Sequence, residues 1–85
     1  MYLHIGQDWI IPIAEIIGIF QEDLLHQSRD FRHLFLRWQG EGRVFGDPDE
    51  AKTVVLTDER LFLTSISTHT LMRRAAKVES LFESD

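Results

Sequence analysis

The segment Ile16-Ile17-Gly18-Ile19-Phe20 has no polar side chain at any position, and this pattern constrains the fold more than any other. Alternate side chains of a β-strand point to opposite faces of its sheet. We therefore expect Ile16 and Phe20 to point to one face, and Ile17 and Ile19 to the other. A small monomeric domain usually packs one face of an antiparallel sheet against its core and leaves the other face exposed to water. The segment thus predicts self-association, in which a second copy covers the remaining face.

Length and composition limit the class of protein. Eighty-five residues make one domain, which we expect over 1–78, with a frayed acidic tail at 79–85. Apolar residues make up 44%, enough for a core and too many for a disordered chain. The net charge of −5 disfavours general binding to nucleic acid, whose affinity rests largely on cations that meet phosphates, but it permits a local basic patch.

Hydropathy and cysteine content bear on the cellular location. No apolar run approaches the ~18 residues of a membrane span, and the first residues lack the basic start and apolar block of a signal peptide. The chain has no cysteine, so disulfides and thiolate metal sites are excluded. We expect a cytoplasmic protein with no membrane partner.

Periodicity and turn residues predict seven elements. Strands are expected at 2–5, 9–11, 16–20, 53–57 and 61–65, and helices at 28–39 and from Ser67 or Thr68 to about Val78. The expected fold class is α+β, with a small antiparallel sheet and the order β-β-β-α-β-β-α. Antiparallel pairing is expected because the connections are too short for the crossovers that parallel strands require.

The helix expected at 28–39 is amphipathic. Its apolar stripe consists of Phe31, Leu34, Phe35 and Trp38. The opposite side carries Arg29, Arg32, His33 and Arg37, with Leu36 among them. A solvated charged face is the ordinary interpretation of such a pattern. The alternative is contact with another subunit, because arginine is common at interfaces and Leu36 would be sheltered there.

A second basic cluster lies on the last helix, at Arg73, Arg74 and Lys77. These side chains could meet phosphates or carboxylates of a partner. The alternative is that they complement the helix dipole near its C-terminal end.

The sequence shows no pattern of catalytic or metal-binding chemistry. The four histidines lack the i, i+4 spacing of a helical metal site. The hydroxyl residues around His69 are better explained as helix caps than as a nucleophile and base. The acidic loop Asp47-Pro48-Asp49-Glu50 lacks the calcium-loop pattern, and phosphate-binding glycine motifs are missing. We therefore expect that the protein is not an enzyme and that it binds no metal and no cofactor.

Short motifs in a fixed order carry a resemblance that covers nearly the whole chain. They are MYLHIG at 1–6, EIIGIF at 15–20, TVVLT at 53–57, SIS at 65–67, TL at 70–71 and RRA at 73–75. With these motifs the chain resembles the bacterial extracellular matrix regulatory protein family, and most closely its RemB (YaaB-like) branch.

The resemblance implies a regulatory role. The related RemA branch is a small transcriptional activator of biofilm matrix genes, with a LytTR-like DNA-binding protomer that closes into a ring and wraps DNA around a basic rim. The same fold and ring are implied here. Two positions depart from that branch: Glu15 stands where it has an arginine, and the acidic loop at 47–50 replaces an arginine-rich loop, with only Lys52 basic.

Two functions follow. The first is a regulator of extracellular matrix and biofilm gene expression, a ring-shaped oligomer that contacts DNA. The second is an oligomeric protein-interaction scaffold that binds no DNA. The candidate DNA-binding or partner-binding residues are Arg29, Arg32, Arg37, Lys52, Arg73, Arg74 and Lys77. The candidate oligomer interface is Ile17, Ile19 and Leu36.

Overall fold

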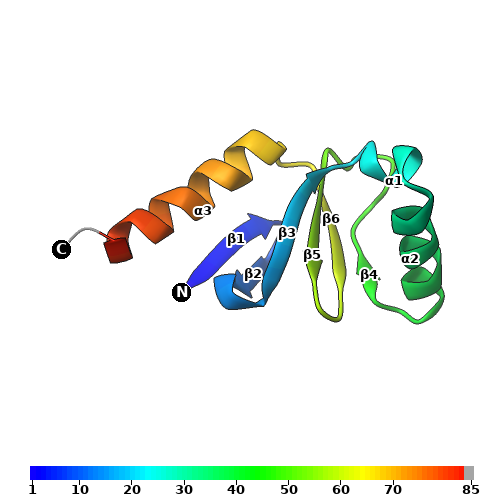
Figure 1. The fold of residues 1–85 in the computed structure, drawn as a ribbon, viewed down its shortest axis with the longest axis horizontal. Helices are drawn as coiled ribbons and strands as arrows, with labels where there is room; N and C mark the ends of the chain where they lie inside the picture. Colours follow the sequence, from blue (N-terminus) through cyan, green and yellow to red (C-terminus); the bar gives the residue numbers. More distant parts are fainter. Residues whose placement is uncertain (84–85) are drawn as a thin grey trace.

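The computed structural model describes residues 1–83, with side chains described through Lys77, and it confirms an α+β fold (Figure 1). The elements are β1 (Tyr2–Gly6), β2 (Trp9–Pro12), the 3-10 turn η1 (Ile13–Glu15), β3 (Ile16–Gln21), α1 (Leu24–Gln27), α2 (Arg29–Gly40), β4 (Val44–Phe45), β5 (Thr53–Thr57), β6 (Leu61–Thr64) and α3 (Thr68–Glu83).

The strands form two sheets, where one antiparallel sheet was expected. β1 and β2 make an antiparallel hairpin, and the second sheet has the order β3-β5-β6-β4. Within it β4 pairs with β6 in parallel. The expectation of purely antiparallel pairing was wrong at this pair because the chain reverses direction twice, through β5, between β4 and β6. The two-residue β4 is also too short to produce a strand pattern in the sequence.

The four-stranded sheet lies between two layers (Figure 1). On one face the β1-β2 hairpin and α3 bury one cluster: Leu3, Ile5, Ile11, Val55, Phe62 and Leu71. On the other face α1 and α2 bury a second cluster: Leu25, Trp38, Val54, Leu61 and Leu63. The chain thus covers both faces of its own sheet. The expectation that a second copy must supply this cover was wrong, although self-association itself stays a prediction.

A β-bulge changes which residues of β3 share a face. Ile16 pairs with Thr57 and Gly18 pairs with Leu56, so Ile17 is the extra residue between them. An extra residue shifts the alternation of side chains by one position. Ile16 and Ile19 consequently pack together on the first cluster. The expected face pairs were therefore wrong, and Ile17 is left 63% exposed.

The expected amphipathicity of α2 is confirmed. The Ser28 Oγ accepts a hydrogen bond from the Phe31 N–H at 3.2 Å, which caps the helix. Trp38 is buried, and the rest of the stripe packs against the second cluster. Between β3 and α2, where no element was expected, the chain forms the single helical turn α1, in which Leu25 is buried.

The start of α3 is fixed by two hydroxyl residues with different roles. The Ser67 Oγ accepts from the Thr70 N–H at 3.2 Å and is the capping side chain. The Thr68 Oγ1 instead lies 2.9 Å from the Thr53 Oγ1 on β5. From there α3 leaves the body of the molecule and projects past the β1-β2 hairpin (Figure 1). The helix continues to Glu83. The expected apolar position Val78 lies beyond the described side chains, and so does the tail at 79–85, for which fraying stays a prediction.

Two glycines offer a matched test of the fold. Gly46 has φ +107°, and a Cβ there would collide with the Leu63 carbonyl oxygen, whereas a Cβ at Gly40 would meet no atom within 4 Å. We expect Gly46→Ala to destabilise the protein by roughly 2 kcal/mol or more, since backbone conformation and space both oppose it. Gly40→Ala should be neutral or stabilising by up to about 1 kcal/mol. Urea unfolding measures both, and equal midpoints would contradict the close approach of Gly46 to Leu63.

Candidate functional site

The described part of the chain offers no enclosed chemical site. Among those residues, no group of three or more His, Asp or Glu could hold a metal ion. No described helix is long and apolar enough to cross a membrane. The candidate sites in the described residues are therefore exposed surfaces.

The first surface is the α2 outer face, which we define as Arg29, Arg32, His33, Leu36 and Arg37. All five side chains are exposed, and Leu36 is 55% exposed. The face is oriented away from the sheet because the opposite stripe of α2 packs on the second cluster. The Arg32 Nη1 donates a long hydrogen bond of 3.5 Å to the His26 carbonyl, and such a weak bond leaves the exposed cation accessible to a partner.

The second surface is the α3 basic face, defined as Arg73, Arg74 and Lys77. All three are exposed, and residues 68–77 contain no carboxylate. The Arg74 Nη1 donates a hydrogen bond of 3.1 Å to the His4 carbonyl, which links α3 to β1. Arg73 and Lys77 are four residues apart and thus share one row of the helix.

Lys52 lies apart from both basic surfaces. Its N–H donates to the Thr64 carbonyl at 2.8 Å, and its carbonyl accepts from the Glu22 N–H at 3.0 Å, so its backbone is part of the sheet end. Its exposed side chain follows the acidic loop at 47–50, in which the Asp47 Oδ1 accepts from the Asp49 N–H at 2.9 Å. The structure therefore does not gather the candidate cations into one patch. α2 and α3 cover opposite faces of the sheet, and Lys52 stands in an acidic surrounding.

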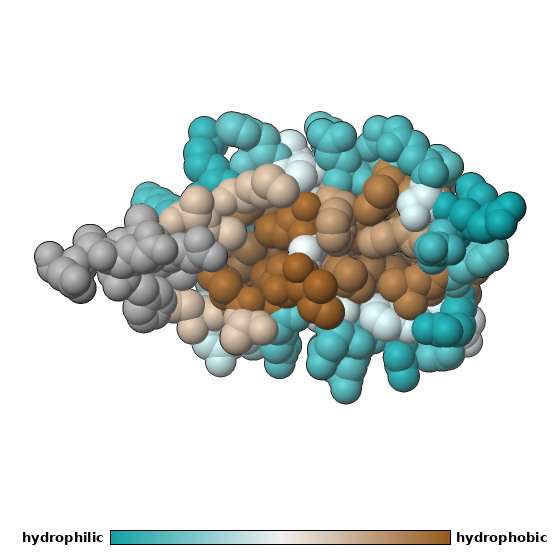
Figure 2. Space-filling model, viewed as in Figure 1, coloured by the Kyte–Doolittle hydropathy of each residue, from teal (hydrophilic) through white to brown (hydrophobic). Residues whose placement is uncertain are grey.

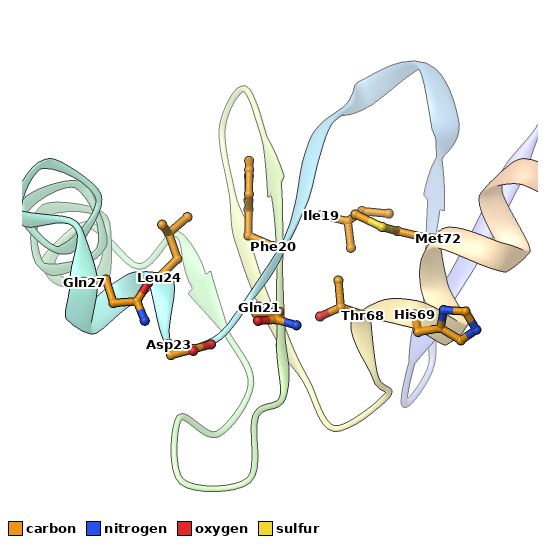
Figure 3. Close-up of a pocket in the computed structure, with 9 residues that line it drawn as sticks. All are labelled: Ile19, Phe20, Gln21, Asp23, Leu24, Gln27, Thr68, His69 and Met72. Atoms are coloured by element: carbon orange, nitrogen blue, oxygen red, sulfur yellow. The ribbon is translucent and has the colours of Figure 1, made fainter.

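The third surface lies along the free edge of the sheet and joins the expected residues Ile17 and Ile19 to Met72, which the sequence did not indicate. Two adjoining hollows of about 480 and 370 Å³ flank β3, and Ile19 and Met72 line both of them. Figure 3 shows these two side chains, one from β3 and one from α3, pointing toward each other. Figure 2 shows apolar residues gathered across this side of the molecule, with hydrophilic residues above and below.

We call this surface the β3 strip and define it as Ile17, Ile19 and Met72. Met72 is 51% exposed and follows Leu71, which is fully buried, so helical periodicity could not identify it as part of a site. Carboxylates stand at both ends of the strip: Glu15 precedes β3, and Asp23 follows it and lines the larger hollow. Of the expected interface residues, Ile19 lines both hollows. Ile17 is exposed on the same strand between Ile16 and Gly18, which line the smaller hollow, and Leu36 lies elsewhere, on α2.

A further apolar surface covers the outer side of the β1-β2 hairpin. Tyr2 is 65% exposed and Ile10 is 61% exposed. Their partners across the hairpin are Pro12 and His4. In β1 the alternation of Tyr2 and His4 with Leu3 and Ile5 is the sequence signal for its outer side, whereas the run Trp9-Ile10-Ile11 in β2 has no polar residue that would indicate which side is exposed.

One known protein gives a full-length comparison. The chain is 29% identical to Extracellular matrix regulatory protein B of Bacillus subtilis (strain 168) over 85 residues, which is 100% of this chain and 99% of that protein. No family model matches the chain. The similarity agrees with the resemblance that the short motifs indicate.

The Arg74 link between α3 and β1 can be tested against its neighbour. We expect Arg74→Gln to lower the free energy of unfolding by about 0.5–1.5 kcal/mol, because it removes a hydrogen bond between two elements. Arg73→Gln, at an exposed position for which the described residues give no such bond, should change stability by less than about 0.5 kcal/mol. Urea denaturation followed by circular dichroism compares the two, and a larger loss for Arg73→Gln would refute the link.

Proposed function

The chain is similar over its full length to an extracellular matrix regulatory protein, and on that premise we propose that it regulates bacterial extracellular matrix and biofilm genes. In this proposal it acts in the cytoplasm, without enzymatic activity, as a ring-shaped homo-oligomer of LytTR-like protomers that contacts DNA. The relative's name supports the matrix-regulating role. The ring and the DNA contact rest on the surface features below.

Self-association is supported by exposed apolar side chains in separate places. Ile17 and Met72 on the β3 strip and Leu36 on the α2 outer face are each more than half exposed. Scattered exposed apolar residues are normal, but grouped ones flanked by charge are typical of interaction surfaces. A closed ring also requires two different interaction surfaces on each protomer, since each subunit contacts two neighbours.

The single observation that supports DNA contact is the α3 basic face. Arg73, Arg74 and Lys77 are exposed on a ten-residue stretch, 68–77, without a carboxylate. Cations on an exposed helix can meet the phosphate backbone without reading its sequence. A ring repeats this face once per subunit, so weak contacts would add along one duplex.

A protein-interaction scaffold is the second candidate function, and the acidic loop favours it. Asp47, Asp49 and Glu50 are all exposed, and the whole chain carries a net charge of −5. Repeated around a ring, these carboxylates would repel phosphates and attract a basic partner protein. Such a scaffold would act on the same genes only through a partner protein that itself binds DNA.

Assembly is tested by light scattering after size exclusion. We expect the native chain to be several times heavier than its 10.0 kDa monomer. Ile17→Glu or Leu36→Glu should give smaller species, because a buried unpaired charge is costly. Ser65→Glu, at an exposed position between β6 and α3, is the control and should assemble normally. A native chain that stays monomeric would refute the ring.

DNA contact is tested by a gel shift against random and matrix-gene duplexes at several salt concentrations. We expect binding at low salt. The double variant Arg73→Gln with Lys77→Gln should reduce the salt slope by about two units, roughly one for each lost phosphate contact. Arg60→Gln on the β5-β6 turn is the control and should leave the slope unchanged. No binding by the native oligomer even at low salt would exclude direct contact and favour the scaffold.

A further inference from the structure

We propose that the α2 outer face of one copy docks on the β3 strip of the next copy. The inference rests on the proposed oligomer and names its two contacting surfaces. It assigns Arg29, Arg32 and Arg37 to a subunit contact, which leaves any phosphate contact to the α3 basic face and Lys52.

The two surfaces are chemically complementary. Each has an exposed apolar centre, Leu36 on α2 and Ile17 with Met72 beside β3. The outer side of α2 exposes three arginines against one carboxylate, Asp30. β3 has exposed carboxylates beyond both ends, Glu15 and Asp23, with the cation Arg73 next to Met72 on α3. An apolar centre with a charged rim is the usual anatomy of a protein interface, and opposite rims set the orientation of the partners.

The dimensions of the surfaces also agree. Arg29, His33 and Arg37 are spaced by four residues and form one row, which spans about 12 Å along the helix axis. The six residues of β3 span about 20 Å. The row is therefore shorter than β3, and the arginine side chains at its two ends extend toward the carboxylates that flank the strand.

Like surfaces cannot pair with each other in the same way. Two α2 outer faces would bring Arg29, Arg32 and Arg37 of each copy together, and two β3 strips in parallel contact would bring the Glu15 carboxylates of both copies together. In antiparallel contact, Glu15 of one copy would lie near Asp23 of the other. Like charges across an interface are costly. The contact is therefore between different surfaces, which produces a ring or a filament rather than a two-fold dimer.

The hollows explain why the strip can accept a helix. Beside β3 the surface is concave over both hollows, and Ile19 and Met72 form their shared wall. β3 is an edge strand, paired only with β5. A helix with an exposed Leu36 can lie along this edge and shelter Ile17, which is unpaired at the bulge and 63% exposed.

Mixing two blocked variants tests the pairing directly. Leu36→Glu blocks the α2 outer face and keeps the β3 strip, whereas Ile17→Glu blocks the strip and keeps α2. We expect each variant alone to run near 10.0 kDa, and the equimolar mixture to form a 1:1 heterodimer of about twice that mass, because one intact pair of surfaces remains. Circular dichroism of each variant confirms that it is folded. A mixture that stays monomeric, or a stable homodimer of either variant, would overturn the proposal.

Charge reversal gives a second, independent readout. Arg29→Glu with Arg37→Glu should raise the dissociation concentration of the assembly at least tenfold, and adding Glu15→Lys with Asp23→Lys to the same chain should restore assembly. Ser65→Glu, which adds a carboxylate at an exposed position outside both surfaces, is the control and should leave the mass unchanged.

The outcomes separate the two proposals. A native oligomer that is insensitive to the α2 and β3 reversals overturns this docking and leaves the proposed function intact. A native chain that is monomeric overturns both.

Discussion

The burial of β5 on both sides is the constraint on which the other elements depend. Val54 and Val55 are adjacent, so they point to opposite faces of the sheet, and both have 0% exposure. Each fully buried valine contributes roughly 1.5–3 kcal/mol only if a complete layer excludes water from its face. The β1-β2 hairpin with α3 supplies one layer, and α1 with α2 supplies the other.

The polar groups beside β5 are satisfied within the same arrangement. Thr53 has 0% exposure, and its Oγ1 donates to the Ile66 carbonyl at 2.7 Å and lies 2.9 Å from the Thr68 Oγ1. A buried hydroxyl without a partner would be costly. Here the hydroxyl joins the central strand to the start of α3. It thereby positions the helix that bears Met72 and the basic residues, so the core and the candidate surfaces share one determinant.

Because the chain's own elements cover both faces of the sheet, the apolar residues that stay exposed are not needed for the core and are candidates for contact with a partner. Ile17 is exposed because a bulge removes it from the alternation of β3, and Leu36 is exposed because it lies opposite the packed stripe of α2. Neither exposure helps the lone chain fold. In the docking that we propose, the charges beside these two residues are of opposite sign, and a neighbouring copy would cover both.

By itself the sequence determined the local elements whose signals are short in range. The cap at Ser28, the apolar stripe of α2 and the first strand follow from the spacing of a few neighbouring residues, whereas the structure decided that Ser67 rather than Thr68 caps α3. Tertiary structure alone decided the bulge at Ile17, the parallel pairing of β4, the exposure of Met72 and the division of the cations among three places. Those features depend on which distant segment lies beside each residue, and the free energy that selects them comes from packing across the sheet rather than from any local preference of the chain.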